Sequence, residues 1–370
     1  MISIISSSHY PDDERIFHKQ IQALITTGYF VYYFTRSDQN KNLSSSYIKH
    51  QNFSSKVDIS NYIKSIYNII TAIPKIRYIQ IHETELLPLF KLIKQKENSV
   101  VTIYDVHENM EALYRTFSNR IKPIKEIAIK IRKIQEKRYL KYVDKTILAN
   151  PPISKRYYLQ YGDQTNIIEN FPELKFIQRK YKSNNDNNTK IIYHGHLGPE
   201  RGIDVLVMAM VDVINFFPEA SLTLIGTFRT THFKDKIHYL INELGLSNSV
   251  QILDQISYTE IWSILKIHSI GVIPFVENHL TKENTPTKLF EMMSVGLKIV
   301  CSDLPPIRNF VNNSVYWANP GNVLSLSKAI INASASSGNE IIIEKNKQLI
   351  KEKYNWENKK TEYLSLFNSQ

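Results

Sequence analysis

The amino-terminal 35 residues alternate a buried strand, a helix and a second strand. Residues 1–7 are mostly apolar and β-branched, and residues 14–27 place apolar side chains at helical spacing. Gly28 is placed to end that helix, and residues 30–35 return to a strand pattern. This order predicts a parallel sheet of the doubly wound α/β class.

Two further predicted strands, residues 78–81 and 100–104, end in clusters of polar side chains. In open α/β sheets ligands sit beyond the carboxyl ends of the strands, so both clusters point to one cleft. A histidine in this position is also a common structural hydrogen-bonding group. The polar residues that follow the two strands are His82, Glu83, Asp105, His107 and Glu108.

Chain length and composition predict two globular domains. With 370 residues, 42% of them hydrophobic and 22% charged, the chain is long enough for two domains and has a globular composition. We place an amino-terminal domain at residues 1–174, a polar, asparagine-rich linker at 175–189 and a second domain at 190–353. Residues 354–370 are predicted to contain the last helix.

The single cysteine, Cys301, rules out an internal disulfide and fits a reducing compartment. We expect it to be a small buried side chain and not a nucleophile. The first residues make a poor signal peptide because their apolar run is short and soon turns acidic. No apolar run approaches the roughly 20 residues of a membrane span. We therefore expect a soluble or peripheral protein in the cytoplasm.

Most of the net positive charge gathers in one predicted helix. Residues 115–145 contain 11 Lys and Arg and 3 Asp and Glu, which gives +8 of the formal net charge of +11. Apolar residues recur there at helical spacing, namely Ile121, Ile124, Ile127, Ala128, Ile131 and Ile134. The basic residues between them are Lys122, Lys125, Lys130, Arg132, Lys133 and Lys137.

This pattern predicts a basic amphipathic helix that binds an anionic membrane surface, where each nearby basic residue contributes about 1 kcal/mol. The alternative is a helix packed on its own domain with a solvated basic face. Nucleic acid ranks below both as a partner, because the chain has neither zinc-finger spacing nor an aromatic RNA-binding signature. We therefore expect no nucleic-acid partner.

Residues 283–296, ENTPTKLFEMMSVG, predict a helix whose start binds an anion. Thr285 is a good N-cap, Pro286 fits the first helical position, and Lys288 adds a full charge to the free amides of the first turn. Such a site suits a nucleotide diphosphate, with a carboxylate for the ribose hydroxyls. An ordinary capped helix with a solvated lysine and two surface carboxylates is the alternative. The two carboxylates are Glu283 and Glu291.

A second candidate for phosphate binding follows the strand predicted at residues 190–193. Its loop, HGHLGPERG, places three glycines around His196 and Arg201, and a helix is predicted at 203–213. A strand, a glycine-bearing loop and a helix bring backbone amides and a cation to a phosphate. A glycine-spaced loop on its own has a high false-positive rate.

Several segments resemble retaining glycosyltransferases of family 4, of the bacterial surface-polysaccharide type. Glu283 and Glu291 are separated by seven residues, and NTPTKLFEMMSVGLKIVCSDLP is similar to the donor-binding segment of that family. YDVHENM resembles the segment that places a histidine beside the donor sugar, and HYPDDERIFHKQIQAL resembles the opening of some members. The resemblance implies the GT-B fold, in which two doubly wound, Rossmann-like domains face a central cleft and the last helix crosses back to the first domain.

The resemblance also implies roles for individual residues. Glu283 and His107 would act beside the transferred sugar, and Glu291 would hold the ribose. His196 stands where arginine is commoner in the family. The residues implied to bind the rest of the donor are Gly195, His196, Arg201, Pro286, Thr287, Lys288 and Leu289.

Three residues of the first loop, His9, Asp12 and Arg15, are candidates to line the acceptor side of the cleft. Many relatives have glycines in this loop, whereas this chain has none before Gly28. Capping of the following helix by Asp12 or Asp13 is a simpler account of the acidic pair.

The resemblance implies transfer of a sugar, with retention, from a nucleotide sugar to a glycan or lipid-linked sugar in surface-polysaccharide synthesis. A UDP-sugar is favoured over a GDP-sugar. We expect no metal and no other cofactor, because no Asp-x-Asp stands at the proposed donor site. The expected location is the inner face of the cell membrane, as a peripheral protein. The alternatives are a nucleotide-sugar epimerase of the same fold and a non-catalytic membrane-surface or nucleic-acid binding protein with a degenerate nucleotide site.

Overall fold

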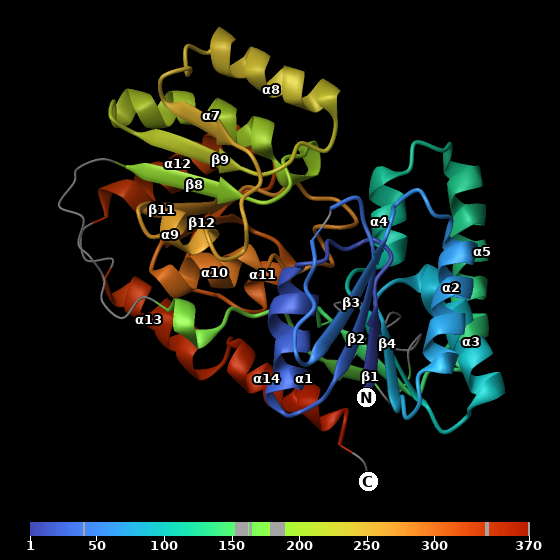
Figure 1. Ribbon diagram of the computed structural model, residues 1–370. Helices are drawn as coiled ribbons and strands as arrows, with labels where there is room; N and C mark the ends of the chain where they lie inside the picture. The colour runs from blue at the N-terminus through green and yellow to red at the C-terminus, as the bar shows by residue number, and fades with distance from the viewer. Residues whose placement is uncertain (40, 152–161, 163–164, 178–188, 337–339, 369–370) are drawn as a thin grey trace. The chain divides into compact units, whose positions relative to one another are not determined.

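The computed structural model describes residues 1–39, 41–151, 162, 165–177, 189–336 and 340–368. The helix predicted at 153–161 and residues 178–188 of the predicted linker lie outside this described part. The chain forms two compact units, Met1–Asn170 with Trp356–Gln370, and Phe171–Asn355. Each unit contains one sheet with helices on both of its faces (Figure 1).

The first unit has seven parallel strands in the order β3-β2-β1-β4-β5-β6-β7. All residues of β1 are buried, because β1 pairs with β2 on one side and β4 on the other and both faces of the sheet are covered. The strands are β1 Ile2–Ile5, β2 Val31–Arg36, β3 Ile48–Phe53, β4 Tyr78–Ile81, β5 Val101–Val106, β6 Lys145–Leu148 and β7 Thr165–Ile167.

One face of this sheet carries η1, α1 and the carboxy-terminal α14, and the other carries α2, α3 and α5 (Figure 1). The helix α4 contacts α5. Their bounds are η1 Glu14–Ile21, α1 Gln22–Thr26, α2 Ile59–Ala72, η2 Thr84–Leu86, α3 Leu87–Lys96, α4 Met110–Phe117, α5 Lys122–Leu140 and α14 Trp356–Ser365.

The first helix begins as a π-helix, η1, and continues as α1. Asp13 is its N-cap, and the Asp13 carboxylate accepts hydrogen bonds from the backbone N–H groups of Arg15 and Ile16. Gly28 follows the helix with φ of 86°, a backbone conformation that favours glycine. Of the two capping candidates in the sequence, Asp13 is therefore the cap, and the predicted end of the helix is confirmed.

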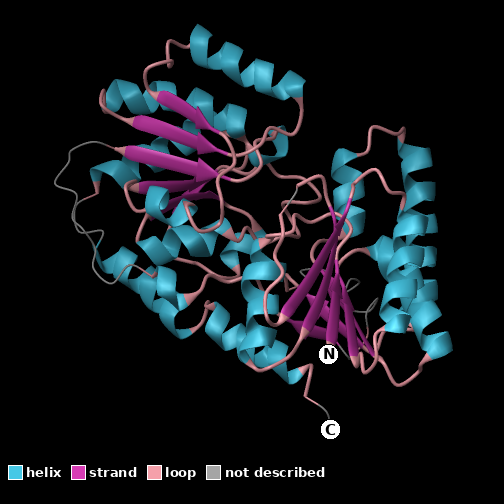
Figure 2. Ribbon diagram, in the orientation of Figure 1, coloured by secondary structure: helices cyan, strands magenta, loops and turns pink. Residues whose placement is uncertain are grey.

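The second unit has six parallel strands in the order β10-β9-β8-β11-β12-β13. Figure 2 shows the strands of each unit in magenta and the helices in cyan. Its strands are β8 Lys190–His194, β9 Ser221–Ile225, β10 Val250–Leu253, β11 Ile270–Ile273, β12 Lys298–Ser302 and β13 Tyr316–Ala318. Cys301, on β12, is fully buried in the core of this unit, as expected from the sequence.

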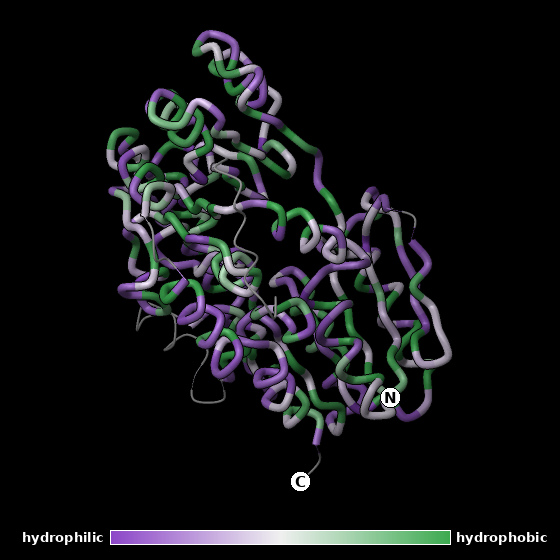
Figure 3. Tube along the Cα trace, turned by 90° about the vertical axis from the view of Figure 1, so that its left-hand side faces the viewer, coloured by the Kyte–Doolittle hydropathy of each residue, from purple (hydrophilic) through white to green (hydrophobic). Residues whose placement is uncertain are grey.

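The helices α7, α8 and α12 lie on one face of the second sheet, and α9, α10 and α13 on the other (Figure 1). Along these helices green and purple residues alternate in Figure 3, as expected where one side of each helix covers a core. The bounds are η3 Leu174–Phe176, η4 Pro199–Arg201, α7 Ile203–Phe216, α8 Thr231–Glu243, α9 Ile261–Leu265, α10 Lys288–Val295, α11 Pro305–Arg308, α12 Val323–Ala335 and α13 Glu340–Glu352.

The predicted parallel, doubly wound architecture is confirmed in both units. In each sheet the strand order reverses beside the first strand of the unit, between β1 and β4 and between β8 and β11. Ligands of such sheets bind beyond the strand ends at this switch point. The loops after β1, β4, β8 and β11 are therefore the positions where a site is expected.

Candidate functional site

The loop after β8 approaches the start of α10 within the second unit. Gly195 has φ of 110°, and a Cβ placed on it would lie 2.8 Å from the Nζ atom of Lys288. Gly202, in the left-handed region, precedes α7, and a Cβ there would lie 1.9 Å from the carbonyl oxygen of Pro274. Glycine at these two positions lets the loop after β8 pack closely against the segment after β11.

The helix α10 begins later than the sequence predicted. Its N-cap is Thr287, without a side-chain capping bond, and Lys288 is its first residue. The carbonyl of Pro286 accepts a hydrogen bond from the N–H of Leu289, so Pro286 forms a turn before the helix, and the prediction of Thr285 as N-cap is wrong. Gly296 ends the helix in the left-handed conformation, as predicted.

The side chains of Lys288 and Arg201 both lie against the ring of Phe275. The Nζ atom of Lys288 lies 3.9 Å from the ring centroid of Tyr193 and 5.4 Å from that of Phe275. The Arg201 guanidinium lies 4.7 Å from the same Phe275 centroid. Burial, followed by the positive charge of Arg201, holds the pKa of Lys288 well below its usual range. Two cations held this close in an apolar setting are suited to an anionic ligand.

Arg201 is held in place by a carboxylate of the short helix η4. Glu200 is buried and lies 3.5 Å from the Nε atom of Arg201 and 3.0 Å from that of Arg229. Desolvation, with the cations Arg229, Arg201 and Lys288, lowers the pKa of His196 to about 4. His196 is therefore neutral at pH 7 and can form a hydrogen bond, whereas the arginine commoner in the resembled family would carry a charge.

Glu291 is buried on α10 beside a histidine that the sequence reasoning missed. The Oε2 atom of Glu291 lies 3.3 Å from the Nε2 atom of His194, the last residue of β8. Burial, followed by Lys288, lowers the pKa of His194 to about 3, so this histidine is neutral. Glu283 lies in the turn before α10, half-buried, with its N–H bonded to the carbonyl of Leu280. His194 is the last residue of β8, at the switch point of the sheet. That position is the sequence feature that could have identified it as a candidate.

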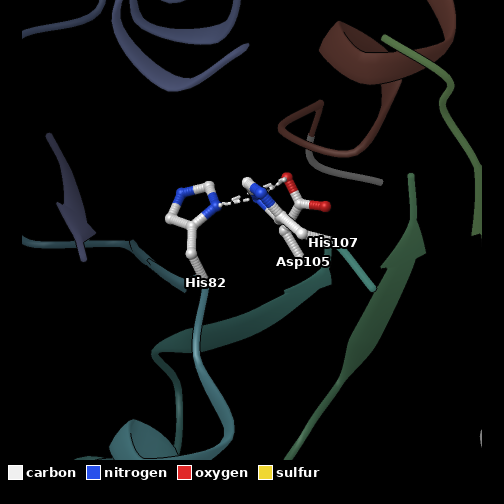
Figure 4. Close-up of side chains that lie close together, drawn as sticks. All are labelled: His82, Asp105 and His107. Carbon is white, nitrogen blue, oxygen red and sulfur yellow. Dashed lines mark hydrogen bonds and ion pairs between the residues drawn. The ribbon is translucent and has the colours of Figure 1, made fainter. Parts of the chain in front are cut away.

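A second cluster of polar side chains lies within the first unit, after β4 and β5. His82, Asp105 and His107 gather there, and Figure 4 shows their side chains converging. The Nδ1 atom of His82 lies 2.8 Å from the Nε2 atom of His107, and these atoms lie 3.5 and 3.6 Å from Asp105 Oδ2. Among the residues that the structure describes, this is the one cluster with a spacing that could hold a metal ion.

Arg15 is 3% exposed and pairs with Asp105 through its Nε and Nη2 atoms, at 3.1 and 2.9 Å. Its Nη1 atom donates to the carbonyl of Ile168. All three nitrogens of the guanidinium are thus used inside the unit, and the structure places Arg15 in the core and not on an acceptor surface. Asp12, the second acceptor-side candidate, pairs with Lys41.

His9 lies beside His107, with ring centroids 4.4 Å apart. The Nδ1 atom of His9 lies 2.8 Å from Glu83 Oε1, and the same carboxylate accepts from the backbone N–H groups of Ser7 and Ser8. Burial opposes a charge on His9, but the hydrogen bond to Glu83 and nearby carboxylates raise its pKa to about 9. His9 is therefore a cation at pH 7, and it brings positive charge to the loop after β1.

The basic helix α5 presents isoleucines to solvent. Ile124, Ile127, Ile131 and Ile134 are 48–60% exposed, whereas Ile129 and Glu136 are buried. At 3.6 residues per turn the four exposed isoleucines form a stripe opposite the two buried residues. The alternative weighed above, a helix that packs its apolar side on its own unit, therefore does not hold for this stripe.

The six basic residues predicted for this surface fall into two groups. Lys125 donates to the carbonyl of Arg115, Lys133 pairs with Glu111, and Arg132 lies over the ring of Tyr114. The remaining three are exposed, and they are Lys122, Lys130 and Lys137. Within the described part of the chain no helix combines the length and the apolarity that crossing a bilayer requires.

Comparisons with known proteins agree with this fold. Residues 175–356 match the family described as glycosyl transferases group 1. A search of curated proteins gives no match. Among solved structures, sucrose-phosphate synthase from Thermosynechococcus elongatus is similar with a TM-score of 0.78 and 17% identity, over 99% of this chain and 98% of that chain.

A second similar structure is Anabaena Alr3699/HepE in complex with UDP, with a TM-score of 0.75, 14% identity and coverage of 99% of each chain. The same protein in complex with UDP-glucose gives a TM-score of 0.77 at 14% identity. At these identities the likeness shows the fold. The chain has the GT-B fold, and its residues 175–356 match the glycosyl transferases group 1 family.

Proposed function

We propose that the protein transfers a sugar from a nucleotide sugar to a hydroxyl of a glycan or lipid-linked acceptor. The observation that carries this proposal is the pair of cations, Lys288 and Arg201, on the Phe275 ring at the β8–β11 switch point of the group 1 domain. Similar structures in complex with UDP and UDP-glucose support a UDP-sugar as the donor. In this proposal Lys288 and Arg201 bind the diphosphate beside Gly195, Pro286, Thr287 and Leu289. The N–H groups of Gly195, Leu289 and Phe290 already donate to the carbonyls of Ile225, Pro286 and Thr287, so the two basic side chains make the main contacts.

In this proposal the second unit stabilises the leaving diphosphate. Negative charge develops on its oxygens as the bond to the sugar breaks, and Lys288 and Arg201 offset that charge. Glu291 accepts hydrogen bonds from the ribose hydroxyls. Glu283 and His107 position the transferred sugar. The reaction retains the anomeric configuration through attack on the front face, with leaving-group phosphate accepting the proton of the acceptor hydroxyl, and it needs no metal.

Two carboxylate variants separate donor binding from turnover. We expect Glu291→Gln to raise the dissociation constant for UDP by about tenfold to 100-fold, because a hydrogen bond to a charged group contributes about 1.5–3 kcal/mol. Glu283→Gln should leave this constant nearly unchanged and lower kcat. Calorimetric titration and the initial rate of UDP release measure the two effects.

The matched control is Glu277→Gln, which changes an exposed carboxylate in the segment between β11 and α10. It should alter neither quantity. Unchanged binding in Glu291→Gln together with unchanged turnover in Glu283→Gln would contradict these two assignments.

We further propose that α5 holds the protein on an anionic membrane surface at the cytoplasmic side, where a lipid-linked acceptor of surface-polysaccharide synthesis is available. The exposed isoleucine stripe supports an apolar contact, and the exposed Lys122, Lys130 and Lys137 support attraction to anionic headgroups. Charge complementarity favours a membrane over a neutral protein partner.

Removing the apolar stripe tests the membrane proposal. Ile127→Ser with Ile131→Ser should lower the partition coefficient onto vesicles of mixed neutral and anionic lipid by at least about tenfold, because a buried isoleucine contributes roughly 1.5–3 kcal/mol. Sedimentation with vesicles measures the coefficient. The control is Ile267→Ser with Ile341→Ser, which removes two isoleucines of the second unit that are 60% and 80% exposed. Equal binding of both double variants would contradict the role of α5.

A further inference from the structure

The cluster around Asp105 contains a chain of buried hydrogen bonds whose direction can be worked out. Asp105 is fully buried and accepts two N–H groups of Arg15. Burial opposes its ionisation, but the Arg15 guanidinium holds the pKa of Asp105 well below its usual range. Asp105 is therefore an anion and can only accept hydrogen bonds.

The anion fixes the orientation of two buried amides in turn. The Oδ2 atom of Asp105 lies 2.6 Å from Gln20 Nε2, so the NH₂ group of Gln20 must face it. The carbonyl oxygen of Gln20 then faces Gln80 and accepts from Gln80 Nε2 at 2.9 Å. The carbonyl oxygen of Gln80 accepts from the Tyr363 hydroxyl of α14 at 2.8 Å. Reversing either amide would place two acceptors or two donors against each other, which costs free energy in a buried site.

The oriented amide of Gln80 also sets the proton on His82. Gln80 Nε2 lies 3.2 Å from His82 Nε2, and because the amide nitrogen is a donor, this ring nitrogen must be the acceptor. His82 is neutral, since burial lowers its pKa to about 3, so its single proton lies on Nδ1. That N–H faces His107 Nε2 at 2.8 Å and donates to it.

We propose that Asp105, Gln20, Gln80 and His82 form a one-way hydrogen-bond relay that holds His107 as the tautomer with its proton on Nδ1. His107 Nε2 accepts the hydrogen bond from His82. A proton on His107 Nε2 would place two N–H donors against each other. Gln20, Gln80 and His82 are positioning residues in this account.

The relay assigns His107 a definite chemical role. Its Nδ1–H is a hydrogen-bond donor to a ligand oxygen, such as a sugar hydroxyl, and its occupied Nε2 makes it unsuited to accept a proton. The identity of that ligand rests on the proposed function, whereas the tautomer does not. The relay also argues against a metal ion on His82, Asp105 and His107, because a metal would need the lone pair of His82 Nδ1, which carries the proton.

Long-range ¹H–¹⁵N correlation spectra of the ¹⁵N-histidine-labelled protein test the tautomer directly. The rings are assigned by the loss of signals in His82→Asn and His107→Asn. The relay predicts a proton on Nδ1 and a hydrogen-bond acceptor at Nε2 in each of the two rings. A proton on Nε2 of His107 would overturn the proposal whether or not the protein transfers a sugar. The tautomers are read from the wild-type spectrum, and the two variants serve only to assign its signals.

Gln80→Glu tests the direction of the relay. A glutamate oxygen in place of the NH₂ group requires a proton on His82 Nε2, so the expected result is reversal of both histidine tautomers and a fall of at least about tenfold in kcat, with the UDP dissociation constant unchanged. Tyr363→Phe is the matched control, because it removes a bond to Gln80 without changing which group faces His82. Reversed tautomers in Tyr363→Phe, or unchanged tautomers in a folded Gln80→Glu, would overturn the relay.

Discussion

Lys288→Met is expected to raise the dissociation constant for UDP by about tenfold to 100-fold. Methionine keeps an unbranched apolar chain against Tyr193 and Phe275 but removes the ammonium group, and a hydrogen bond to a charged partner contributes about 1.5–3 kcal/mol. Isothermal titration measures the constant. Lys282→Met, a half-exposed lysine paired with Glu277 in the segment before α10, is the control and should change nothing.

The same titration should show proton uptake. Burial and Arg201 lower the pKa of Lys288 in the free protein, and a bound diphosphate would raise it again because the anion favours the ammonium form. Binding therefore takes up a proton at pH values above the free-protein pKa, and the affinity for UDP falls as pH rises through that window. Titrations in two buffers of different ionisation enthalpy measure the uptake. Equal uptake by wild type and Lys288→Met would contradict this assignment.

Arg15→Met is expected to destabilise the first unit by about 3–5 kcal/mol, because removing one partner of a buried ion pair leaves the other charge without compensation. At about 2–4 °C per kcal/mol for a unit of this size, the unfolding midpoint should fall by roughly 6–20 °C. Differential scanning calorimetry measures the midpoint. The remaining Asp105 would keep Gln20 as a hydrogen-bond donor but lose its counter-charge.

Lys41→Met is the matched control for Arg15→Met. It breaks the more exposed pair between Lys41 and Asp12, and such surface pairs contribute about 0–1 kcal/mol. If Arg15→Met were as stable as Lys41→Met, the buried pair of Arg15 and Asp105 would not stabilise the unit as described above. Arg15 would then again be a candidate for acceptor binding.

The parallel fold could be predicted because its central strands are short, apolar and separated by helices of clear period. The central strand β4 has the bounds, residues 78–81, expected from the sequence. Two edge strands, β3 and β13, were missed. Each pairs on one side only, and β3 has a polar sequence, IKHQNF, with few buried residues, so neither carries the continuous apolar run of an interior strand.

The candidate site in the second unit could be predicted in outline because its residues follow strand ends. The start of α10 could not, because the turn at Pro286 satisfies the local hydrogen bonds before the helix begins. His194 escaped notice because its importance comes from its distance to Glu291, which lies on another segment. In the first unit, the link from Asp105 to Tyr363 joins residues far apart in the chain, and no local pattern reveals such contacts.

The orientation of α5 shows a related limit. Its sequence predicts an amphipathic helix, but period alone does not say which side packs inward. In the structure Ile129 faces inward, whereas most of the isoleucines of α5 face solvent. The exposed ones are Ile124, Ile127, Ile131 and Ile134. The packing of α5 against α3 and α4 decides this, and it also gives Lys125, Arg132 and Lys133 partners within the unit.

The central claim, that the second unit binds a nucleoside diphosphate through Lys288 and Arg201, is tested most directly by thermal unfolding of the wild-type protein with UDP, GDP or ADP. A nucleotide at about 100 times its dissociation constant stabilises by about 2.7 kcal/mol, which corresponds to roughly 5–10 °C. We predict a rise of this size with UDP and little change with the others. No rise with any of the three nucleotides would contradict the claim.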